Sequence, residues 1–338
     1  MAQRVILDTD PGIDDSLAIL LALASPELDL ACVTVTGGNC PLENGFRNAR
    51  NVLSIARRSD IPTYAGVGLP LIRPAFTALE THGDTGLGYA HLPESDEAYS
   101  TDHGVDMLIN TIMAQPGKVT LVAVAPLTNV AMAIRKEPRI VQAVREVIIM
   151  GGALRADGNT TSLAEFNFFV DPHAAHIVLE SGMPITLVPW DITKDVLLMS
   201  EHLDRLRSID SPITQFVIDA TRYYIEFHLG TFGYEGCSIN DPVALALAFR
   251  PDLATTEAMH VAIEYTSELT IGKTVVSYIG HNNREPDEHD ISGFDTKMWP
   301  SQWRHAYRPR PNVRAVTAFN TPAFIDLFVS RIVQLAKR

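Results

Sequence analysis

The chain has 338 residues, of which 46% are hydrophobic, so it is long and apolar enough to bury a large core. Its 40 acidic residues outnumber its 27 basic residues and give a formal net charge of -13. This balance argues against a nucleic acid or an anionic membrane as a partner, because both bind clustered lysine and arginine. A small polar substrate remains compatible with it.

The N-terminal residues carry no pattern of a secretory signal. After Arg4 only three apolar residues precede Asp8, far fewer than the hydrophobic region of a signal peptide contains. No apolar run reaches the about 18 residues of a membrane span. The cysteines, Cys32, Cys40 and Cys237, are odd in number and widely scattered, which indicates reduced, buried thiols. We therefore expect a cytoplasmic protein without a membrane partner.

Strand-like and helix-like segments alternate in the first half of the chain. The expected strands are Val5–Leu7, Leu28–Thr36, Val119–Ala125, Val147–Met150 and Ile185–Val188. The expected helices are Asp15–Ala24, Leu42–Arg58, Val105–Ala114, Leu127–Arg135 and Pro172–Ser181. The strand Val119–Ala125 lacks polar alternation, which is typical of a sheet covered on both faces. This rhythm predicts a mainly parallel sheet with helices on both sides.

The second half adds helices, and then strands that need not be parallel to the first ones. Its expected helices are Ser211–Phe227, Asp241–Phe249 and the closing helix Thr321–Lys337. Met259–Glu264 and Thr274–Ile279 are expected as an antiparallel addition, followed by a last strand, Val313–Phe319. No linker separates two cores. The sequence thus predicts an α/β, Rossmann-like fold with an open, mixed sheet, in a single domain over residues 1–338.

Polar residues follow several of the expected strands at their carboxyl ends, where open α/β sheets bind ligands. The first strand ends at Asp8-Thr9-Asp10, and the second ends at Thr36-Gly37-Gly38-Asn39. The strand Val147–Met150 is followed by two glycines, and small residues at strand ends let a ligand approach the backbone. The segment beyond holds Asn159, Glu165 and Asn167. Together these residues predict one acidic, amide-lined crevice.

Four carboxylates lie within eight residues in this region: Asp8, Asp10, Asp14 and Asp15. Helix capping and turn formation account for one or two of them, at about 0.3–1 kcal/mol for each acid near a helix N-terminus. Four in one turn are costly unless a cation or a polar ligand compensates them. Calcium suits such a site because it takes about 6–8 oxygen ligands. Zinc does not, because no His/Cys cluster has the spacing of zinc ligands.

The stretch from Asp8 to Ile19, DTDPGIDDSLAI, resembles the signature of the inosine-uridine-type nucleoside hydrolases. Further segments with the same resemblance are Pro126–Asn129, Met150–Gly152, Asn159–Asn167 and Asp171–Ala175. Asn240-Asp241-Pro242 stands where the family usually has His-Asp-Pro. The similarity extends over most of the chain. It implies an enzyme that releases the free base and ribose from a ribonucleoside, active as a homodimer or homotetramer.

The resemblance also implies a role for each matching residue. Asp10, Asp15 and Asp241 would bind Ca²⁺ through their side chains, and Val124 would bind it through its carbonyl. Ribose hydroxyls and one water would complete the shell, and Asp10 would take the proton from that water as the general base. Residues implied to hold or approach the ribose are Asp14, Asn39, Met150, Asn159, Glu165, Phe166 and Asn167. The carboxylates would stabilise the positive charge that develops on the sugar.

The residues expected around the leaving base depart from the family pattern. Asn240 replaces the usual histidine, and an amide donates a hydrogen bond but supplies no proton at neutral pH. His82 and His228 are the candidate acids, although His228 also suits the exposed face of an amphipathic helix. Tyr224 and Phe232 lie where family members contact the base, with core packing as the alternative for Phe232. Residues 71–101 and 221–237 are expected to be mobile segments of the site.

Two other functions are compatible with part of this pattern. Aspartyl-phosphate phosphatases also place Asp-x-Asp after an apolar strand and use Mg²⁺, but they normally continue with Thr or Val where this chain has Gly12. That function leaves Asp15 and the segment around Glu165 unexplained. The other alternative is a non-catalytic nucleoside-binding protein on the same scaffold. Asn240 permits it, whereas the intact Asp10 argues against it.

Overall fold

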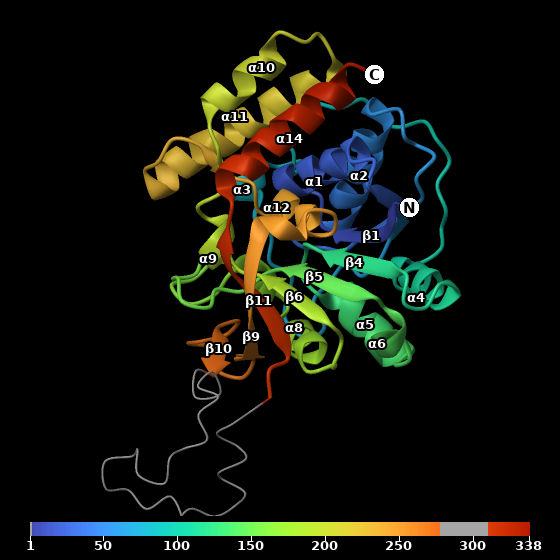
Figure 1. Ribbon diagram of the computed structural model, residues 1–338, viewed down its shortest axis with the longest axis vertical. Coiled ribbons are helices and arrows are strands. Elements are labelled where there is room, and N and C mark those ends of the chain that lie inside the picture. Colours follow the sequence, from blue (N-terminus) through green and yellow to red (C-terminus); the bar gives the residue numbers. More distant parts are fainter. Residues whose placement is uncertain (1, 278–309) are drawn as a thin grey trace, which may run out of the picture.

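The computed structural model describes residues 2–277 and 310–338 (Figure 1). In this part of the chain a nine-stranded sheet runs through the centre, in the order β10-β9-β11-β6-β5-β4-β1-β2-β3. Its strands are β1 Gln3–Thr9, β2 Leu28–Val35, β3 Thr63–Ala65, β4 Val119–Ala123, β5 Glu146–Met150, β6 Ile185–Val188, β9 Ala254–Ile263, β10 Thr274–Ser277 and β11 Val313–Phe319.

The pairing of these strands confirms the predicted mixed, mainly parallel sheet. Every pair from β11 to β3 is parallel, whereas β9 is antiparallel to both β11 and β10. The antiparallel addition predicted for the second half is therefore present at one edge. The expected strand Thr274–Ile279 is described as far as Ser277, and its last two residues lie outside the described residues.

Helices cover both faces of the sheet, as Figure 1 shows. On one face lie α1 Ile13–Ala24, α2 Leu42–Ile55, α11 Pro212–Phe232, α12 Asn240–Leu247 and α14 Thr321–Ala336. On the other lie α4 Gly104–Ala114, α5 Thr128–Lys136, α6 Ile140–Ala143 and α8 Pro172–Leu179. Because apolar side chains cover both sides of the central strands, the sheet separates two hydrophobic cores, as the lack of polar alternation in β4 predicts.

The structure differs from the prediction mainly in short elements that hydrophobic periodicity does not reveal. These are β3, α3 Leu79–His82, α6, α7 Phe166–Val170, α9 Trp190–Thr193, β7 Leu197–Leu198, η1 Ser200–Leu203, α10 Asp204–Arg207, β8 Cys237–Ser238 and η2 Pro251–Leu253. In addition, α11 continues past the predicted end at Phe227 to Phe232. It stops at Gly233, whose φ of 77° gives the left-handed helix end that glycine favours.

The strand order places a topological switch point beside β1. The chain leaves β1 for β2 on one side, and the strand on its other side is β4. Crevices at such a point bind ligands in open α/β sheets.

None of the described helices is long and apolar enough to cross a membrane. All three cysteines are buried and unpaired.

Candidate active site

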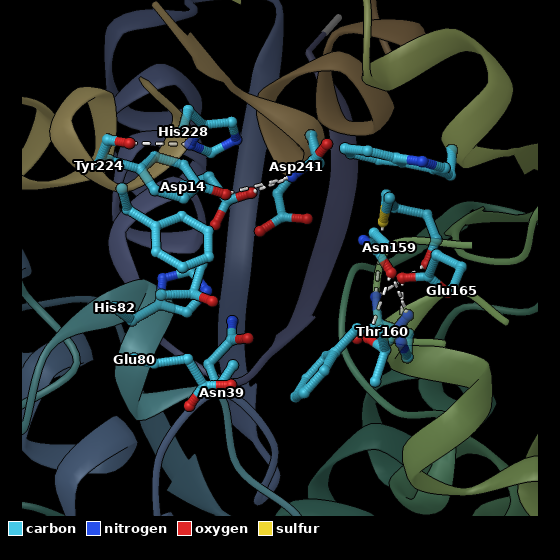
Figure 2. Close-up of a pocket in the computed structure, with 18 of the residues that line it drawn as sticks. Asp14, Asn39, Glu80, His82, Asn159, Thr160, Glu165, Tyr224, His228 and Asp241 are labelled. Atoms are coloured by element: carbon cyan, nitrogen blue, oxygen red, sulfur yellow. Dashed lines mark hydrogen bonds between the residues drawn. The ribbon is translucent and has the colours of Figure 1, made fainter. Parts of the chain in front are cut away.

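A cavity of about 390 Å³ lies beyond the carboxyl ends of β1, β4 and β5. Figure 2 shows Asp14, His82 and Asn39 on one wall, and Asn159, Thr160 and Glu165 on the opposite wall. Predicted site residues that line the cavity are Asp14, Asn39, His82, Val124, Met150, Asn159, Glu165, Phe166, Asn167, Tyr224, His228, Phe232, Asn240 and Asp241. The two remaining predicted residues, Asp10 and Asp15, are fully buried directly beside this lining.

Three buried carboxylates meet at the floor of the cavity. Asp14, Asp15 and Asp241 each offer an oxygen within 4.8 Å of the others, from the first turns of α1 and α12. Next to them, the buried Asp10 Oδ1 has no hydrogen-bond partner among the described residues. An oxygen-rich set with an unpartnered buried carboxylate oxygen fits a hard cation. The residues present therefore fit the expected metal, with Asp14 closer to this set than the resemblance implies.

Hydrogen bonds from nearby backbone and side-chain groups hold the fully buried Asp10 and Asp15 in place. Asp15 accepts four hydrogen bonds, from Thr9 Oγ1 (2.5 Å), from the Asp10 N–H (3.1 Å), from the Gly12 N–H (3.0 Å) and from Asn39 Nδ2 (2.8 Å). The Asn39 N–H donates to Asp10 Oδ2 at 2.6 Å. A side chain at position 38 would collide with that carboxylate, so glycine is required there.

Burial and mutual repulsion disfavour the charged form of these acids. Burial, followed by the charge of Asp15, raises the pKa of Asp14 to about 7. Burial and the neighbouring aspartates also hold the pKa values of Asp10 and Asp241 well above their usual range. A bound cation would reverse this effect because it favours the ionised carboxylates.

The opposite wall consists of amides and one buried acid. Asn167 Nδ2 donates to the carbonyls of Val124 and Met150, both at 3.1 Å, and so joins the ends of β4 and β5. Glu165 accepts from the backbone N–H groups of Gly152 (2.7 Å) and Asn167 (3.0 Å), and burial raises the pKa of its carboxyl to about 7. These contacts bring strand ends that are distant in sequence into one site.

The residues expected around the leaving base lie above the acidic floor. Asn240 Nδ2 donates to Asp14 Oδ2 at 2.8 Å and lies 3.5 Å from the hydroxyl of Tyr224. His82 Nδ1 accepts from the Ile13 N–H at 3.1 Å, which leaves the ring proton on Nε2. Burial lowers the pKa of His82 to about 4, so this ring is neutral at pH 7.

Two alternatives from the sequence are wrong. His228 is not on an exposed helix face, because only 2% of its surface is accessible. Phe232 is not a core residue, since it lines the cavity and is 40% exposed. Burial lowers the pKa of His228 to about 4.

Comparison with known proteins identifies the family. The model of the inosine-uridine preferring nucleoside hydrolases matches residues 5–326. The chain belongs to this family. It is 39% identical to the inosine-uridine preferring nucleoside hydrolase of Crithidia fasciculata over 280 residues, which cover 82% of this chain and 89% of that protein. It is also 34% identical to the pyrimidine-specific ribonucleoside hydrolase RihA of an Enterobacter species, with full coverage of both chains.

Solved structures agree with this assignment. A purine-preferring ribonucleoside hydrolase from Gardnerella vaginalis superposes with a TM-score of 0.87 at 29% identity, and covers 99% of both chains. The plant nucleoside hydrolase PpNRh1 superposes with a TM-score of 0.85 at 30% identity. This nucleoside hydrolase is thus an enzyme that hydrolyses the N-glycosidic bond of ribonucleosides. The family is metal-dependent, and the phosphatase alternative is not favoured.

Several residues of the cavity wall in this nucleoside hydrolase are not singled out by the sequence, although six of them fall within the segments 71–101 and 221–237 that are expected to belong to the site. They are Phe76, Ala78, Glu80, Thr81, Thr160, Trp190, Phe227 and Thr231. Most are apolar or lie on short elements such as α3 and α9, so no motif marks them. Thr160 adjoins Asn159, and Phe227 lies one helical turn from Tyr224, so adjacency to predicted residues is the signal that indicates these two.

Proposed function

We propose that the metal is Ca²⁺ and that Asp10 is the general base for hydrolysis of ribonucleosides. The observation that carries this proposal is the unpartnered Oδ1 of the buried Asp10, beside a cluster of three carboxylates of which two, Asp14 and Asp241, line the cavity opposite the amide-lined wall. A base must lie within hydrogen-bond reach of its proton donor, and a free lone pair is what such a contact requires.

Asp10, Asp15 and Asp241 would hold the cation, together with the carbonyl of Val124 at the end of β4. When bound, Ca²⁺ would polarise its oxygen ligands and lower the pKa of a coordinated water. The carboxylates would then be ionised, because a cation offsets the burial that raises their pKa values.

The protein's own residues would bind the sugar and accept the proton. Asp14 and Asn39 would hold ribose hydroxyls from the acidic side, and Glu165 and Asn167 from the amide side. Asp10 would remove a proton from the attacking water through Oδ1. As the N-glycosidic bond breaks, positive charge develops on the ribose ring, and the surrounding carboxylates stabilise it.

The departing base would receive hydrogen bonds from neutral groups. His82 Nε2–H and the amide of Asn240 are two polar groups above the floor, and neither is a charged acid at pH 7. Tyr224 and Phe232 would pack beside the base. This arrangement does not depend on which base leaves, so both uridine and inosine are proposed as substrates.

Release of ribose tests the proposal. Purified protein with Ca²⁺ should liberate reducing sugar from uridine and inosine, chelation should abolish the activity, and added Ca²⁺ should restore it. The matched assay uses Mg²⁺ and an aryl phosphate. Phosphate release without ribose release would favour the phosphatase alternative, whereas nucleoside binding without either product would favour a binding protein.

We also infer a single-domain, cytoplasmic homo-oligomer, a dimer or a tetramer, with mobile segments at residues 71–101 and 221–237. Three buried, unpaired cysteines suit a reducing compartment. The oligomeric state rests on the resemblance to the family, and light scattering coupled to size-exclusion chromatography measures it.

A further inference from the structure

His228 makes two hydrogen bonds to backbone groups, one through each ring nitrogen. Nδ1 lies 2.8 Å from the carbonyl oxygen of Tyr224, one turn earlier in α11. The N–H of Ser238 in β8 donates to Nε2 at 3.4 Å. The ring is 2% exposed, so water does not compete for these positions.

These two partners define the protonation of the ring without ambiguity. A carbonyl only accepts, so Nδ1 must carry the proton; a backbone N–H only donates, so Nε2 must be the free acceptor. The neutral imidazole has one donor and one acceptor, and both are used within the protein. His228 therefore has no proton and no lone pair left for a nucleobase in this arrangement.

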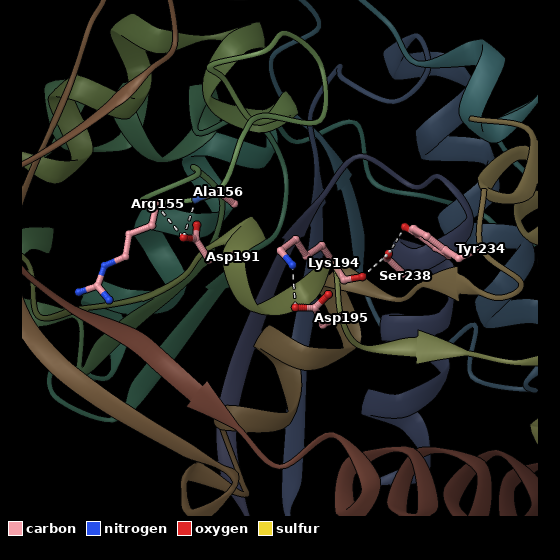
Figure 3. Close-up of polar contacts among 7 residues, drawn as sticks. All are labelled: Arg155, Ala156, Asp191, Lys194, Asp195, Tyr234 and Ser238. Atoms are coloured by element: carbon pink, nitrogen blue, oxygen red, sulfur yellow. Dashed lines mark hydrogen bonds and ion pairs between the residues drawn. The ribbon is translucent and has the colours of Figure 1, made fainter. Parts of the chain in front are cut away.

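The bond to Ser238 continues into a third element. Ser238 Oγ donates to the carbonyl of Lys194 at 3.3 Å and lies 3.4 Å from the hydroxyl of Tyr234 (Figure 3). Lys194 is the C-cap of α9, and Trp190 at the start of that helix lines the cavity. One hydrogen-bonded path thus links α11 through β8 to α9, on two sides of the same cavity.

Aromatic side chains surround His228 at the C-terminal end of α11. The centre of the imidazole lies 4.4 Å from the ring centre of Tyr224, 5.5 Å from Phe232, 5.6 Å from Phe227 and 5.8 Å from Tyr234. Three of these rings, Tyr224, Phe227 and Phe232, line the cavity. These three rings form the aromatic wall of the cavity, and the position of His228 therefore determines their position.

We propose that His228 is a positioning residue that fastens the aromatic end of α11 to β8, and so shapes the wall against which the nucleobase packs. It does not exchange a proton with the base. This inference rests on the proposed function only where it concerns the nucleobase, because the link between α11 and β8 is a property of the protein alone.

Two variants distinguish the effect of losing the hydrogen bond between α11 and β8 from the effect of losing the aromatic ring of His228. His228→Phe keeps an aromatic ring of similar size but loses both hydrogen bonds. His228→Gln loses the ring, yet its side-chain carbonyl reaches the position of Nε2 and accepts from the Ser238 N–H. A positioning role requires that glutamine rescue what phenylalanine loses, whereas an acid role leaves both variants impaired.

In steady-state kinetics His228→Phe should raise KM about three- to tenfold, and equally for uridine and inosine, which is the loss expected for the one hydrogen bond that links α11 to β8. The kcat of His228→Phe should stay within about twofold of that of the unsubstituted protein, and the KM of His228→Gln should return to the value of the unsubstituted protein. In hydrogen exchange of the intact protein, residues 233–238 should exchange faster in His228→Phe than in His228→Gln.

A selective fall of kcat for inosine in both variants, with KM and exchange unchanged, would overturn the proposal and favour an acid. Unchanged KM and unchanged exchange in His228→Phe would also overturn it. If the unsubstituted protein releases no ribose from any nucleoside, the proposed function fails, and hydrogen exchange alone still decides whether His228 links α11 to β8.

Discussion

Asn240 donates a hydrogen bond of 2.8 Å to Asp14, and thereby connects the first residues of α12 and α1, which are 226 positions apart. This contact brings Asn240, which the resemblance to the family places at a usual histidine position, next to a residue proposed to bind ribose. Asn240 is therefore expected to orient Asp14 as well as to replace a proton donor to the leaving base.

Asn240→His should raise the turnover of inosine relative to that of uridine by about tenfold or more, because a general acid contributes about 10²–10⁴ to rate. An imidazolium at this position can give a proton to a purine nitrogen, which an amide cannot do. The ratio of kcat values for the two substrates measures the effect. An unchanged ratio would show that the lack of an acid at position 240 does not limit purine release.

Asp10→Asn should lower kcat by about 10³-fold, since it removes the proposed base. The metal-free variant should melt no lower than the unsubstituted protein, because one of several mutually repelling buried carboxylates is gone. Asp8→Asn is the matched control: this aspartate is equally buried in β1, but it accepts from Thr34 Oγ1 and Asn129 Nδ2. The kcat of Asp8→Asn should stay within about tenfold of the kcat of the unsubstituted protein. Equal losses of kcat in Asp8→Asn and Asp10→Asn would contradict the assignment of Asp10 as the general base.

Calcium should stabilise the protein thermally, because the cation neutralises repulsion among Asp14, Asp15 and Asp241. At 100 times its dissociation constant the expected gain is about 2.7 kcal/mol. Differential scanning calorimetry with chelator and with Ca²⁺ measures it. Asp241→Asn should reduce the gain, and a calcium response that is undiminished in this variant would place the cation elsewhere.

Metal-free protein should become more stable as pH falls from about 7.5 to 5. Burial raises the pKa of Asp8 to about 6 and those of Asp14 and Glu165 to about 7, so the folded state takes up protons that the unfolded chain does not yet bind. The stability that these three acids contribute is fully present below their unfolded pKa values and is lost as pH rises through 6 and 7. His82 and His228, with pKa values lowered to about 4, act in the opposite direction over the same range.

Three acids with raised pKa values, together with Asp10 and Asp241, outnumber these two histidines. Melting temperatures in chelator at pH 5, 6 and 7.5 measure the balance. A melting temperature that falls steadily towards pH 5 would indicate that the histidines dominate, or that the carboxylates stay ionised without metal.

The sheet and the acidic floor could be predicted because both follow from local patterns. Strands without polar alternation, such as Val119–Ala123, indicate burial on both faces, and polar residues at consecutive strand ends must meet at one edge. Asp14 and Asp15 could be placed because they open a helix directly after β1. The closeness of Asp241, by contrast, came only from resemblance to the family, since its contact depends on how α12 packs.

The aromatic wall could not be predicted in full, because tertiary packing determines it. Trp190 is held at the cavity by its backbone N–H, which donates to the carbonyl of Gly152, and by Asp191 next to it, which accepts from the backbone N–H of Leu154. Asp191 also accepts from the N–H groups of Arg155 and Ala156 (Figure 3). His228 matched a family position, but its two bonds need β8, a strand of two residues that has no sequence pattern.

Proton NMR of the ribose formed from uridine by the calcium-loaded enzyme during the first turnovers shows whether water attacks the sugar directly. If Asp10 acts as a base for direct attack by water, the β-nucleoside should yield α-ribose and free uracil before the sugar re-equilibrates. Initial formation of β-ribose would indicate a covalent carboxylate intermediate and contradict the role of Asp10 as the base for water, and the absence of any ribose would contradict the activity itself.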